Sequence, residues 1–219
     1  MLTLQSVSKK YGDQQILRDV DFSIGTKEFV SIVGKSGTGK TTLLSILAGL
    51  VKPDKGDIFF NGENIAHYTQ EQYAHFRLYN IGIVFQDFKI IPSLSVFDNV
   101  YMAVHPRRDI AREQKAAMVR EIVERVGLAR KLENVVDHLS GGEKQRVAIA
   151  RSLVGKPKLV LADEPTGNLD EKTSESIMRL FHTLHQELDT SFVVITHDRD
   201  VARTAQKTYR LTHHHLETL

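Results

Sequence analysis

Short apolar runs that end in polar residues recur along this chain and predict strands buried on both faces. Each run is rich in β-branched or aromatic residues and is bounded by turn residues. The runs are Phe29–Val33, Ile81–Phe85, Lys158–Ala162 and Ser191–Ile195. Between the last two, apolar residues recur at helical spacing at Ile177, Leu180, Phe181, Leu184 and Leu188. Strands that alternate with such helices predict an α/β fold with a mostly parallel sheet.

The N-terminal residues follow a different pattern. Apolar residues alternate with polar ones around Leu2, Leu4 and Val7, and again at Val20, Phe22 and Ile24, with Tyr11-Gly12-Asp13 as the turn region between them. This pattern predicts an antiparallel β subdomain at the N-terminus. A short strand at Ile58–Phe60 follows, and Thr69-x-x-Gln72 is a capping box for a helix that reaches about Tyr79.

From residue 87 the strand pattern disappears. Residues 95 to 154 read as helical, and Val119, Ile122, Val123 and Val126 recur at helical spacing, with Gly127 placed to end a helix. We therefore expect one domain over residues 1–219. Residues 1–86 and 150–219 would form the α/β core, and residues 87–149 a helical subdomain inserted between its halves.

Composition narrows the function classes. The chain has 219 residues, and its 29 Lys+Arg against 27 Asp+Glu give a net charge of +2, too small for a dedicated nucleic-acid binder. The absence of cysteine excludes disulfides and thiolate chemistry. No apolar run reaches the roughly 18–20 residues that cross a bilayer, and the N-terminus does not resemble a signal peptide. If the protein works at a membrane, another component must hold it there.

The strand Phe29–Val33 leads into a phosphate-binding pattern, G-x-x-x-x-G-K-[ST]. Its residues are Gly34, Lys35, Ser36, Gly37, Thr38, Gly39, Lys40 and Thr41. Such a loop turns backbone N–H groups toward an anion at a positive helix N-terminus. Lys40 would reach the β- and γ-phosphates of a nucleotide, and the Thr41 hydroxyl would bind Mg²⁺.

Three further strands also end in polar residues. Gln86 follows Ile81–Phe85, Asp163 and Glu164 follow Lys158–Ala162, and Thr196-His197-Asp198 follows Ser191–Ile195. Parallel strands bring such ends to one edge of the sheet, where ligands bind. Asp163 would hold Mg²⁺ and Glu164 would orient or deprotonate a water in line with the γ-phosphate. Alternatively, Asp163-Glu164-Pro165 only begins a surface loop.

A second glycine-rich stretch lies at Leu139-Ser140-Gly141-Gly142-Glu143. Ser140 and Glu143 form a capping box, so a well-capped helix is a complete explanation. The two glycines beside the cap also leave backbone N–H groups uncovered at a helix N-terminus, which is an anion site. Because one nucleotide does not need two such cradles, we expect a two-fold dimer in which each cradle completes the partner's site.

These motifs together resemble the ATP-binding subunit of ABC transporters, with ATP and Mg²⁺ as cofactors. The resemblance assigns adenine stacking to Tyr11 and the Walker A loop to Gly34–Thr42, including Thr42. It assigns the signature, with Ser140, Gly141, Gly142 and Glu143 at the nucleotide, to Leu139–Glu143, continuing through Lys144-Gln145-Arg146. Gln86 becomes the Q-loop residue, Asp163 the Walker B aspartate, Glu164 the catalytic glutamate and His197 the switch histidine. It also implies a D-loop at Gly167–Asp170, with Asp170 at the nucleotide, and Thr41, Gln86 and Asp163 around the metal.

Two segments, Ile83–Lys89 and Glu164–Asp170, resemble the branch with lipoprotein-releasing, macrolide-exporting and cell-division (FtsE-like) ATPases. This implies an integral membrane permease-type partner, a peripheral location at the cytoplasmic face of the cell membrane, a self-dimer and no nucleic-acid partner. The apolar stretch Phe88, Ile90, Ile91 and Pro92 either receives a helix of that partner or belongs to the core.

Two other function classes remain open. One is a soluble ABC ATPase of DNA repair or translation, and the other is a scaffold whose hydrolysis is incidental. The chain also departs from the family pattern at its end, because Thr212 to His215 stands where an Asp-Gly or similar turn usually precedes the last strand. We expect the histidines there to be solvated and not to bind metal.

Overall fold

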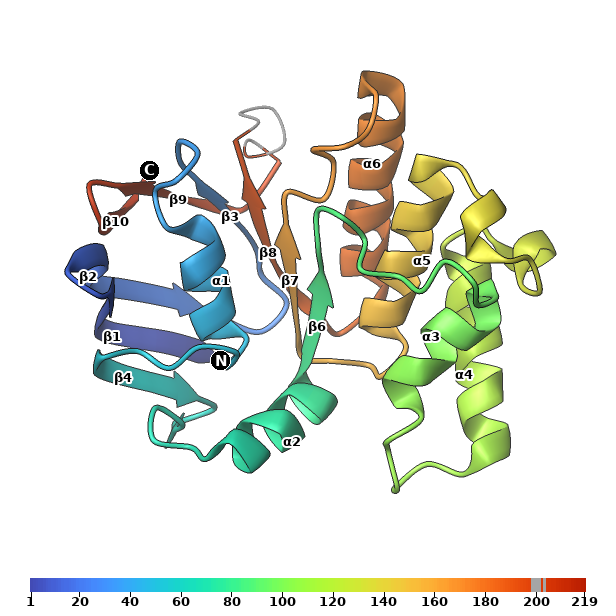
Figure 1. The fold of residues 1–219 in the computed structure, drawn as a ribbon, viewed down its shortest axis with the longest axis horizontal. Coiled ribbons are helices and arrows are strands. Elements are labelled where there is room, and N and C mark those ends of the chain that lie inside the picture. The colour runs from blue at the N-terminus through green and yellow to red at the C-terminus, as the bar shows by residue number, and fades with distance from the viewer. Residues whose placement is uncertain (198–201, 203) are drawn as a thin grey trace.

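A six-stranded, mostly parallel sheet runs through the middle of the molecule (Figure 1). The computed structural model describes residues 1–197, 202 and 204–219, so Asp198, expected at the end of a strand, lies outside the described residues. The strands in spatial order are β10 (His215–Thr218), β9 (Lys207–Thr212), β3 (Phe29–Val33), β8 (Ser191–Thr196), β7 (Leu159–Asp163) and β6 (Ile81–Val84). All neighbours from β9 to β6 are parallel, as predicted, and β10 pairs antiparallel with β9.

A second, four-stranded antiparallel sheet is formed by the N-terminal residues. Its order is β2 (Gln14–Ile24), β1 (Leu2–Tyr11), β4 (Lys55–Phe60) and β5 (Glu63–Asn64). Helix α1 (Lys40–Leu47) shares one apolar cluster with this sheet and with one face of the parallel sheet. Burial of Leu43, Leu44 and Leu47 in that cluster fixes where the helix begins relative to the strands.

Further helices follow β4 in the chain, and the first of them packs in the same apolar cluster as α1. They are α2 (Gln70–Asn80), α3 (Val96–Val104), α4 (Arg112–Arg125), α5 (Gly141–Leu153) and α6 (Glu171–Glu187), with single 3₁₀ turns at Ala129–Lys131 and Val136–His138. The predicted capping box of α2 is present, with Thr69 and Gln72 exchanging hydrogen bonds. Gly127, at φ 78°, ends α4 as expected.

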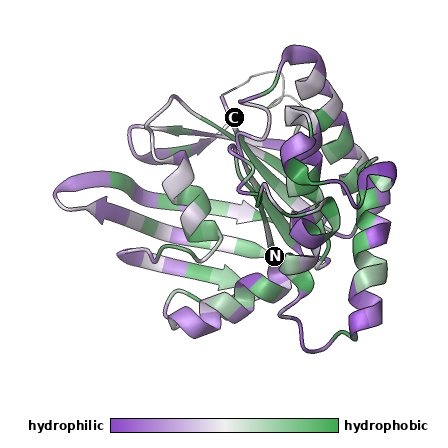
Figure 2. Cartoon of the chain, turned by 45° about the vertical axis from the view of Figure 1, so that its right-hand side comes forward, coloured by the Kyte–Doolittle hydropathy of each residue, from purple (hydrophilic) through white to green (hydrophobic). Residues whose placement is uncertain are grey.

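A second apolar cluster joins α3, α4, α5 and α6 to the opposite face of the parallel sheet. Hydrophobic residues accordingly concentrate on the central strands, and hydrophilic ones on the outer surfaces of the helices (Figure 2). Between residues 87 and 140 the only strand-like pairing is a single bridge from Ser95 to Val135. The expected division at 149/150 stays a prediction, and α5 runs across it without a break.

The three consecutive histidines lie at a turn between two strands. His213 and His214 have φ of 46° and 73°, so both residues of this tight turn are left-handed. His214 is half-buried: its carbonyl accepts from the Arg18 N–H at 2.8 Å, and its Nδ1 lies 3.2 Å from the Ile16 carbonyl. His213 and His215 are exposed, as expected, whereas His214 attaches the turn to β2.

Two features are absent from the described part of the chain. Over those residues, no helix has the length and apolar content needed to cross a membrane. Nor do the same residues contain a group of three or more His, Cys, Asp or Glu side chains arranged to hold a metal ion.

Candidate functional site

The loop between β3 and α1 has the backbone that a phosphate cradle requires. Gly37 and Gly39 have φ of 77° and 101°, in the left-handed region that favours glycine. A Cβ at Gly39 would also lie 2.9 Å from Cγ2 of Ile16 on β2. The loop therefore packs against the β1–β2 hairpin. Helix α1 begins at Lys40, directly after Gly39.

Lys40 is buried and bonded within its own loop. Its Nζ donates to the carbonyls of Gly34 at 2.9 Å and Lys35 at 3.0 Å. The ammonium group also lies 3.8 Å from Oε1 of Glu164. These contacts hold a positive charge where the N-terminus of α1 begins, which is the electrostatic setting that binds phosphate.

Thr41 and Asp163 meet across the site, as the sequence predicts for two residues that bind the same metal ion. The Thr41 hydroxyl donates to Oδ2 of Asp163 at 3.0 Å. Burial at the end of β7 raises the pKa of Asp163, and the hydrogen bond from Thr41 opposes this shift. A hydroxyl and a carboxylate are oxygen ligands of the kind Mg²⁺ prefers, so these two side chains fit that ion.

Gln86, the third residue expected at the metal, lies after β6 at the edge of the sheet. Its carbonyl accepts from Nδ2 of Asn168 at 3.0 Å, and its side-chain nitrogen lies 3.0 Å from where a Cβ at Gly167 would stand. No hydrogen bond among the described residues joins Gln86 to Thr41 or Asp163. The structure therefore brings together two of the three expected metal ligands.

Glu164 has a strained backbone conformation, and its carboxylate lies near the side chains of Lys40 and His197. Its φ is 44°, in the left-handed region, and the following residue is Pro165, which further restricts it. Its Oε2 lies 3.0 Å from Nδ1 of His197. Since β7 and β8 are neighbours, their ends place Glu164 and His197 side by side at the edge that also carries the glycine loop.

The second glycine stretch begins helix α5, with Ser140 as its N-cap. Glu143 N–H donates to Oγ of Ser140 at 3.4 Å, and Oε2 of Glu143 accepts from the Ser140 N–H at 2.9 Å. Glu143 also pairs with Lys131, and this hydrogen bond is the main cause that lowers the pKa of the Glu143 carboxyl. The Glu143 carboxylate is therefore already bonded within the chain, to the Ser140 N–H and to Lys131.

The two glycines after Ser140 face the start of α6. A Cβ at Gly142 would lie 2.6 Å from Cγ2 of Thr173, whereas one at Gly141 would lie 3.4 Å from Cδ2 of Leu169. Asp170 caps α6, because its Oδ1 accepts from the Thr173 N–H at 3.0 Å. Its hydrogen bonds with Thr173 also lower the pKa of Asp170. The N-termini of α5 and α6 thus meet, and Gly142 is required there for packing.

Tyr11 lies at the end of β1, in the hairpin that packs on the glycine loop. Its side chain is 52% exposed, and Nζ of Lys9 stands 5.5 Å from its ring centre. An exposed ring on this hairpin has a free face for a planar ligand.

Two side chains of α5 to which the sequence assigns no role contact the site from behind. Gln145 is fully buried, and its Nε2 donates to the Pro165 carbonyl at 2.6 Å, next to Glu164. Arg151 donates to the carbonyls of Phe88 and Lys89, two and three residues after Gln86. Gln145 belongs to the run Lys144-Gln145-Arg146 that directly follows the signature, whereas no sequence pattern marks Arg151.

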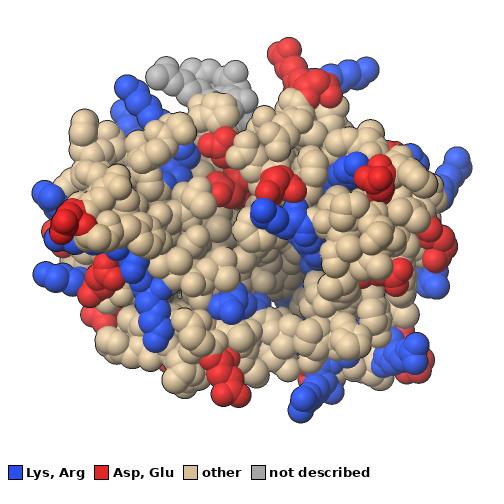
Figure 3. Space-filling view, viewed as in Figure 1, with Lys and Arg blue, Asp and Glu red and all other residues tan. Residues whose placement is uncertain are grey.

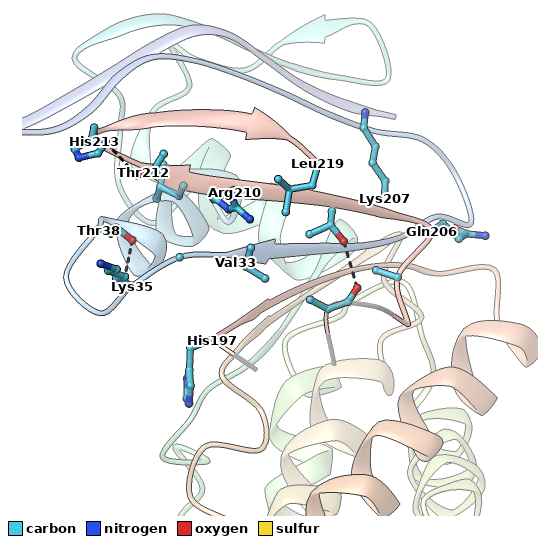
Figure 4. A pocket seen from close by; sticks show the side chains of 15 residues that line it. Val33, Lys35, Thr38, His197, Gln206, Lys207, Arg210, Thr212, His213 and Leu219 are labelled. Atoms are coloured by element: carbon cyan, nitrogen blue, oxygen red, sulfur yellow. Dashed lines mark hydrogen bonds between the residues drawn. The ribbon is translucent and has the colours of Figure 1, made fainter. Parts of the chain in front are cut away.

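A cavity of about 1000 Å³ adjoins the glycine loop on the side of β9 (Figure 4). Lys35 and Thr38 of the loop lie at one end of it, with Arg210 along β9. Elsewhere on the molecule, basic and acidic side chains are interspersed over the face shown in Figure 3, in line with the small net charge.

The site is thus assembled from the ends of four adjacent strands, β3, β8, β7 and β6. It combines a phosphate-binding loop with a lysine, a hydroxyl–aspartate pair and a carboxylate beside a histidine. These features define the class of P-loop nucleotide-binding proteins. The capped glycine pair at the start of α5 is a further feature that such a loop alone does not require.

Comparison with known proteins identifies the family. Residues 17–167 match the family model described as ABC transporter. The chain is 42% identical over 211 residues to the lipoprotein-releasing system ATP-binding protein LolD of Idiomarina loihiensis, covering 94% of this chain and 92% of that protein. It is 38% identical over 208 residues to the ABC transporter ATP-binding protein YtrE of Bacillus subtilis, covering 94% and 90%.

Solved structures agree with this result. The dimeric post-hydrolysis state of the ATP-binding cassette MJ0796 with ADP and Pi matches at a TM-score of 0.88 and 36% identity, over 100% of this chain and 99% of that one. The cbiO1 structure from Clostridium perfringens, part of the ABC transporter complex cbiONQ, matches at 0.90 and 29%, over 99% and 86%. This chain belongs to the ABC transporter family, as an ATP-binding subunit with ATPase activity.

Proposed function

We propose that two copies of this chain close head-to-tail around two ATP molecules and that hydrolysis of ATP reopens the dimer. The observation that carries this proposal is the presence of two phosphate cradles in one chain. In Figure 1 the loop before α1 and the start of α5 lie on opposite sides of the strands β6, β7 and β8. Because the two cradles of one chain are held apart, we expect the start of α5 from a second copy to complete the nucleotide site at the loop before α1.

Each composite site would then contain groups from both copies. Lys40 and the loop N–H groups of one subunit bind the β- and γ-phosphates, and Ser140 with the N–H groups at the start of the partner's α5 covers the γ-phosphate. The solved structures of MJ0796, which are dimeric, support this arrangement. The hairpin carrying Tyr11 offers its exposed ring to the adenine base.

The residues around the γ-phosphate divide the chemistry between them. Thr41 and Asp163 would hold Mg²⁺, which neutralises charge on the phosphates, and Gln86 would complete this set. Glu164 orients the attacking water and accepts its proton, a role that contributes roughly 10²–10⁴-fold to rate. His197, 3.0 Å from Glu164, holds that carboxylate in place and donates to the γ-phosphate.

A mixing experiment tests the composite site. Lys40→Ala removes the phosphate-binding lysine, and Ser140→Arg blocks the second cradle, so each variant alone has no intact site. A mixed dimer regains one complete site, and we expect its ATPase activity to return to a substantial fraction of half the wild-type value. If the mixture remains as inactive as its components while each variant retains its wild-type melting temperature, the trans arrangement is refuted.

We further propose that the ATPase drives an integral membrane, permease-type partner from the cytoplasmic face of the membrane. The relatives named above as transporter ATP-binding proteins support this. Phe88 and Ile90 are half-buried against the apolar cluster of the helices, whereas Ile91 is 38% exposed. We therefore propose that Phe88 and Ile90 serve the core and that Ile91 contacts the partner.

This coupling is tested at Ile91. We expect Ile91→Glu to keep the basal ATPase rate and to lose its stimulation by membranes that contain the partner. Met102→Glu is the matched control, because Met102 is also exposed, at 49%, but lies on α3. Equal stimulation of both variants would argue against a contact at Ile91. Co-purification with nucleic acid in place of membranes would favour the soluble alternative.

A further inference from the structure

The turn that follows Gln86 has an unusual backbone. Phe88 and Lys89 have φ of 59° and 47°, so two consecutive residues other than glycine are left-handed. The Lys89 N–H donates to the Asp87 carbonyl at 2.6 Å, which closes the turn tightly. Residues with a Cβ adopt this region at a cost in free energy, so the surrounding structure must hold the turn.

Arg151 supplies that support from α5. Its Nη2 donates to the Phe88 carbonyl at 2.7 Å, and its Nη1 donates to the Lys89 carbonyl. The planar fork of a guanidinium suits two adjacent acceptors, whereas the single ammonium of lysine does not. No carboxylate in the described ranges forms a salt bridge with Arg151, and burial lowers its pKa. Its charge is therefore committed to the two carbonyls.

Helix α5 connects this turn to the second phosphate cradle. Ser140 caps the helix and Arg151 lies eleven residues further on, about 16 Å along the axis. Between them, Gln145 donates to the Pro165 carbonyl beside Glu164. One rigid helix thus contacts the start of the cradle, the turn after Glu164 and the turn after Gln86.

We propose that Arg151 is the positioning residue of the segment 86–91 and that it couples this segment to α5. By holding the carbonyls of Phe88 and Lys89, it sets the direction in which Gln86 enters the nucleotide site. The far end of the segment is fixed by the buried Asn99, whose side chain accepts from the Ile91 N–H and donates to the Ile91 carbonyl. A displacement of α5 when its N-terminus receives the partner's nucleotide would then move the turn. The functional part of this inference rests on the role proposed above for Gln86.

The test combines two substitutions: Arg151→Met removes the hydrogen bonds that hold the turn, and Lys89→Gly removes backbone strain from it. In Arg151→Met the two carbonyls lose their donors, and we expect amide hydrogen exchange over residues 86–91 to accelerate by roughly tenfold or more. Lys89→Gly permits the left-handed turn without cost. The double variant should therefore recover most of the protection and most of the ATPase rate that Arg151→Met loses.

Lys156→Gly is the matched control. Lys156 is also exposed and left-handed, with φ of 52°, but it lies after α5 and does not belong to the turn that Arg151 holds. We expect it to leave both exchange and ATPase of Arg151→Met unchanged. If Lys156→Gly rescues as well as Lys89→Gly, or if neither does, Arg151 has only a general structural role. Arg151→Lys, which keeps charge and bulk, should show the same defect and the same rescue if Arg151→Met fails to fold.

Hydrogen exchange separates this inference from the proposed function. Should the wild-type protein hydrolyse no ATP, the proposed function fails, but the exchange of residues 86–91 still tests the clamp. Should ATPase be normal in wild type and exchange be unaffected in both Arg151 variants, only the role of Arg151 is overturned.

Discussion

The hydroxyl of Thr41 donates a hydrogen bond of 3.0 Å to Asp163, which lies 122 positions further along the chain. This contact joins the first turn of α1 to the end of β7. It holds in register the two groups proposed to bind Mg²⁺, and it does so in a place where burial disfavours the ionised carboxylate. The arrangement implies that Asp163 is retained for chemistry at some expense in stability.

Asp163→Asn should therefore stabilise the protein in the absence of nucleotide. Because folding raises the pKa of Asp163 above its ordinary 3.8, the folded state holds the proton more tightly than the unfolded state does. The stability that this tighter proton binding contributes is present below pH 3.8 and is lost as pH rises through the raised pKa of Asp163. We expect the variant to melt higher than wild type at pH 7, by about 2–4 °C for each 1 kcal/mol relieved.

The difference in melting temperature should disappear as pH falls below 3.8, where the carboxyl is protonated in both states. Asparagine can still accept the hydrogen bond from Thr41, so the two proteins differ in the ionisation of this side chain and not in that bond. In Mg²⁺ and ATP the order should reverse, because wild type gains more from ligand binding. A variant that melts lower than wild type at pH 7 without nucleotide would contradict this interpretation.

Glu164→Gln should separate binding from turnover. The amide keeps the size of the side chain but cannot accept a proton from water, so kcat should fall by about 10²–10⁴-fold while ATP still binds. Gel filtration in ATP should then show accumulated dimer. Glu171→Gln, which changes an exposed carboxylate in the first turn of α6, is the control. An unchanged hydrolysis rate in Glu164→Gln would remove Glu164 from its assigned role.

Gly142→Ala should be destabilising for a steric reason that a second substitution can remove. The new Cβ would lie 2.6 Å from Cγ2 of Thr173, and such overpacking costs about 1–3 kcal/mol. Thr173→Ser deletes that methyl group and keeps the hydroxyl that bonds Asp170. Denaturant unfolding should show that the double variant regains the lost stability.

Gly141→Ala is the matched control for this pair, since its Cβ would stand 3.4 Å from Leu169. It should lose much less stability than Gly142→Ala. ATP-dependent dimerisation of the rescued Gly142→Ala/Thr173→Ser protein then reports whether Gly142 is also needed at the nucleotide. A double variant as unstable as Gly142→Ala alone would show that Thr173 is not the obstruction.

Tyr11→Ala should weaken ATP binding without affecting the fold. Stacking of a base on an aromatic ring contributes about 1–3 kcal/mol, so the Kd should rise roughly tenfold or more. Tyr11→Phe keeps the ring and should bind normally. Since the side chain is 52% exposed, neither change should shift the melting temperature. Equal affinity of the Ala and Phe variants for ATP would assign Tyr11 to packing alone.

The strand ends at the site were predictable because each is marked locally. An apolar run that stops at Gln86, at Asp163 or at His197 indicates both the strand and the direction of its last side chain, and parallel pairing then brings these ends to one edge. The capping boxes of α2 and α5 were equally local, since each is a pair of residues three apart.

The contacts made by α5 were not predictable in this way. Gln145 and Arg151 reach residues 20 and 63 positions away, so no short pattern reports them. The same holds for the left-handed φ of Glu164, because a glutamate before a proline favours an extended backbone. The strand β9 and the His213–His214 turn were missed because that turn lacks the glycine that usually marks a hairpin.

The hydrogen bonds of Lys40 to the carbonyls of Gly34 and Lys35 have a consequence for nucleotide affinity. The ammonium group already has two oxygen partners, so a phosphate gains only the difference between its own attraction and theirs. Binding is therefore an exchange of partners at Lys40, and its selectivity depends on charge. A dianionic γ-phosphate outcompetes two neutral carbonyls and the Glu164 carboxylate at 3.8 Å, whereas a ligand without that charge leaves the lysine where it is.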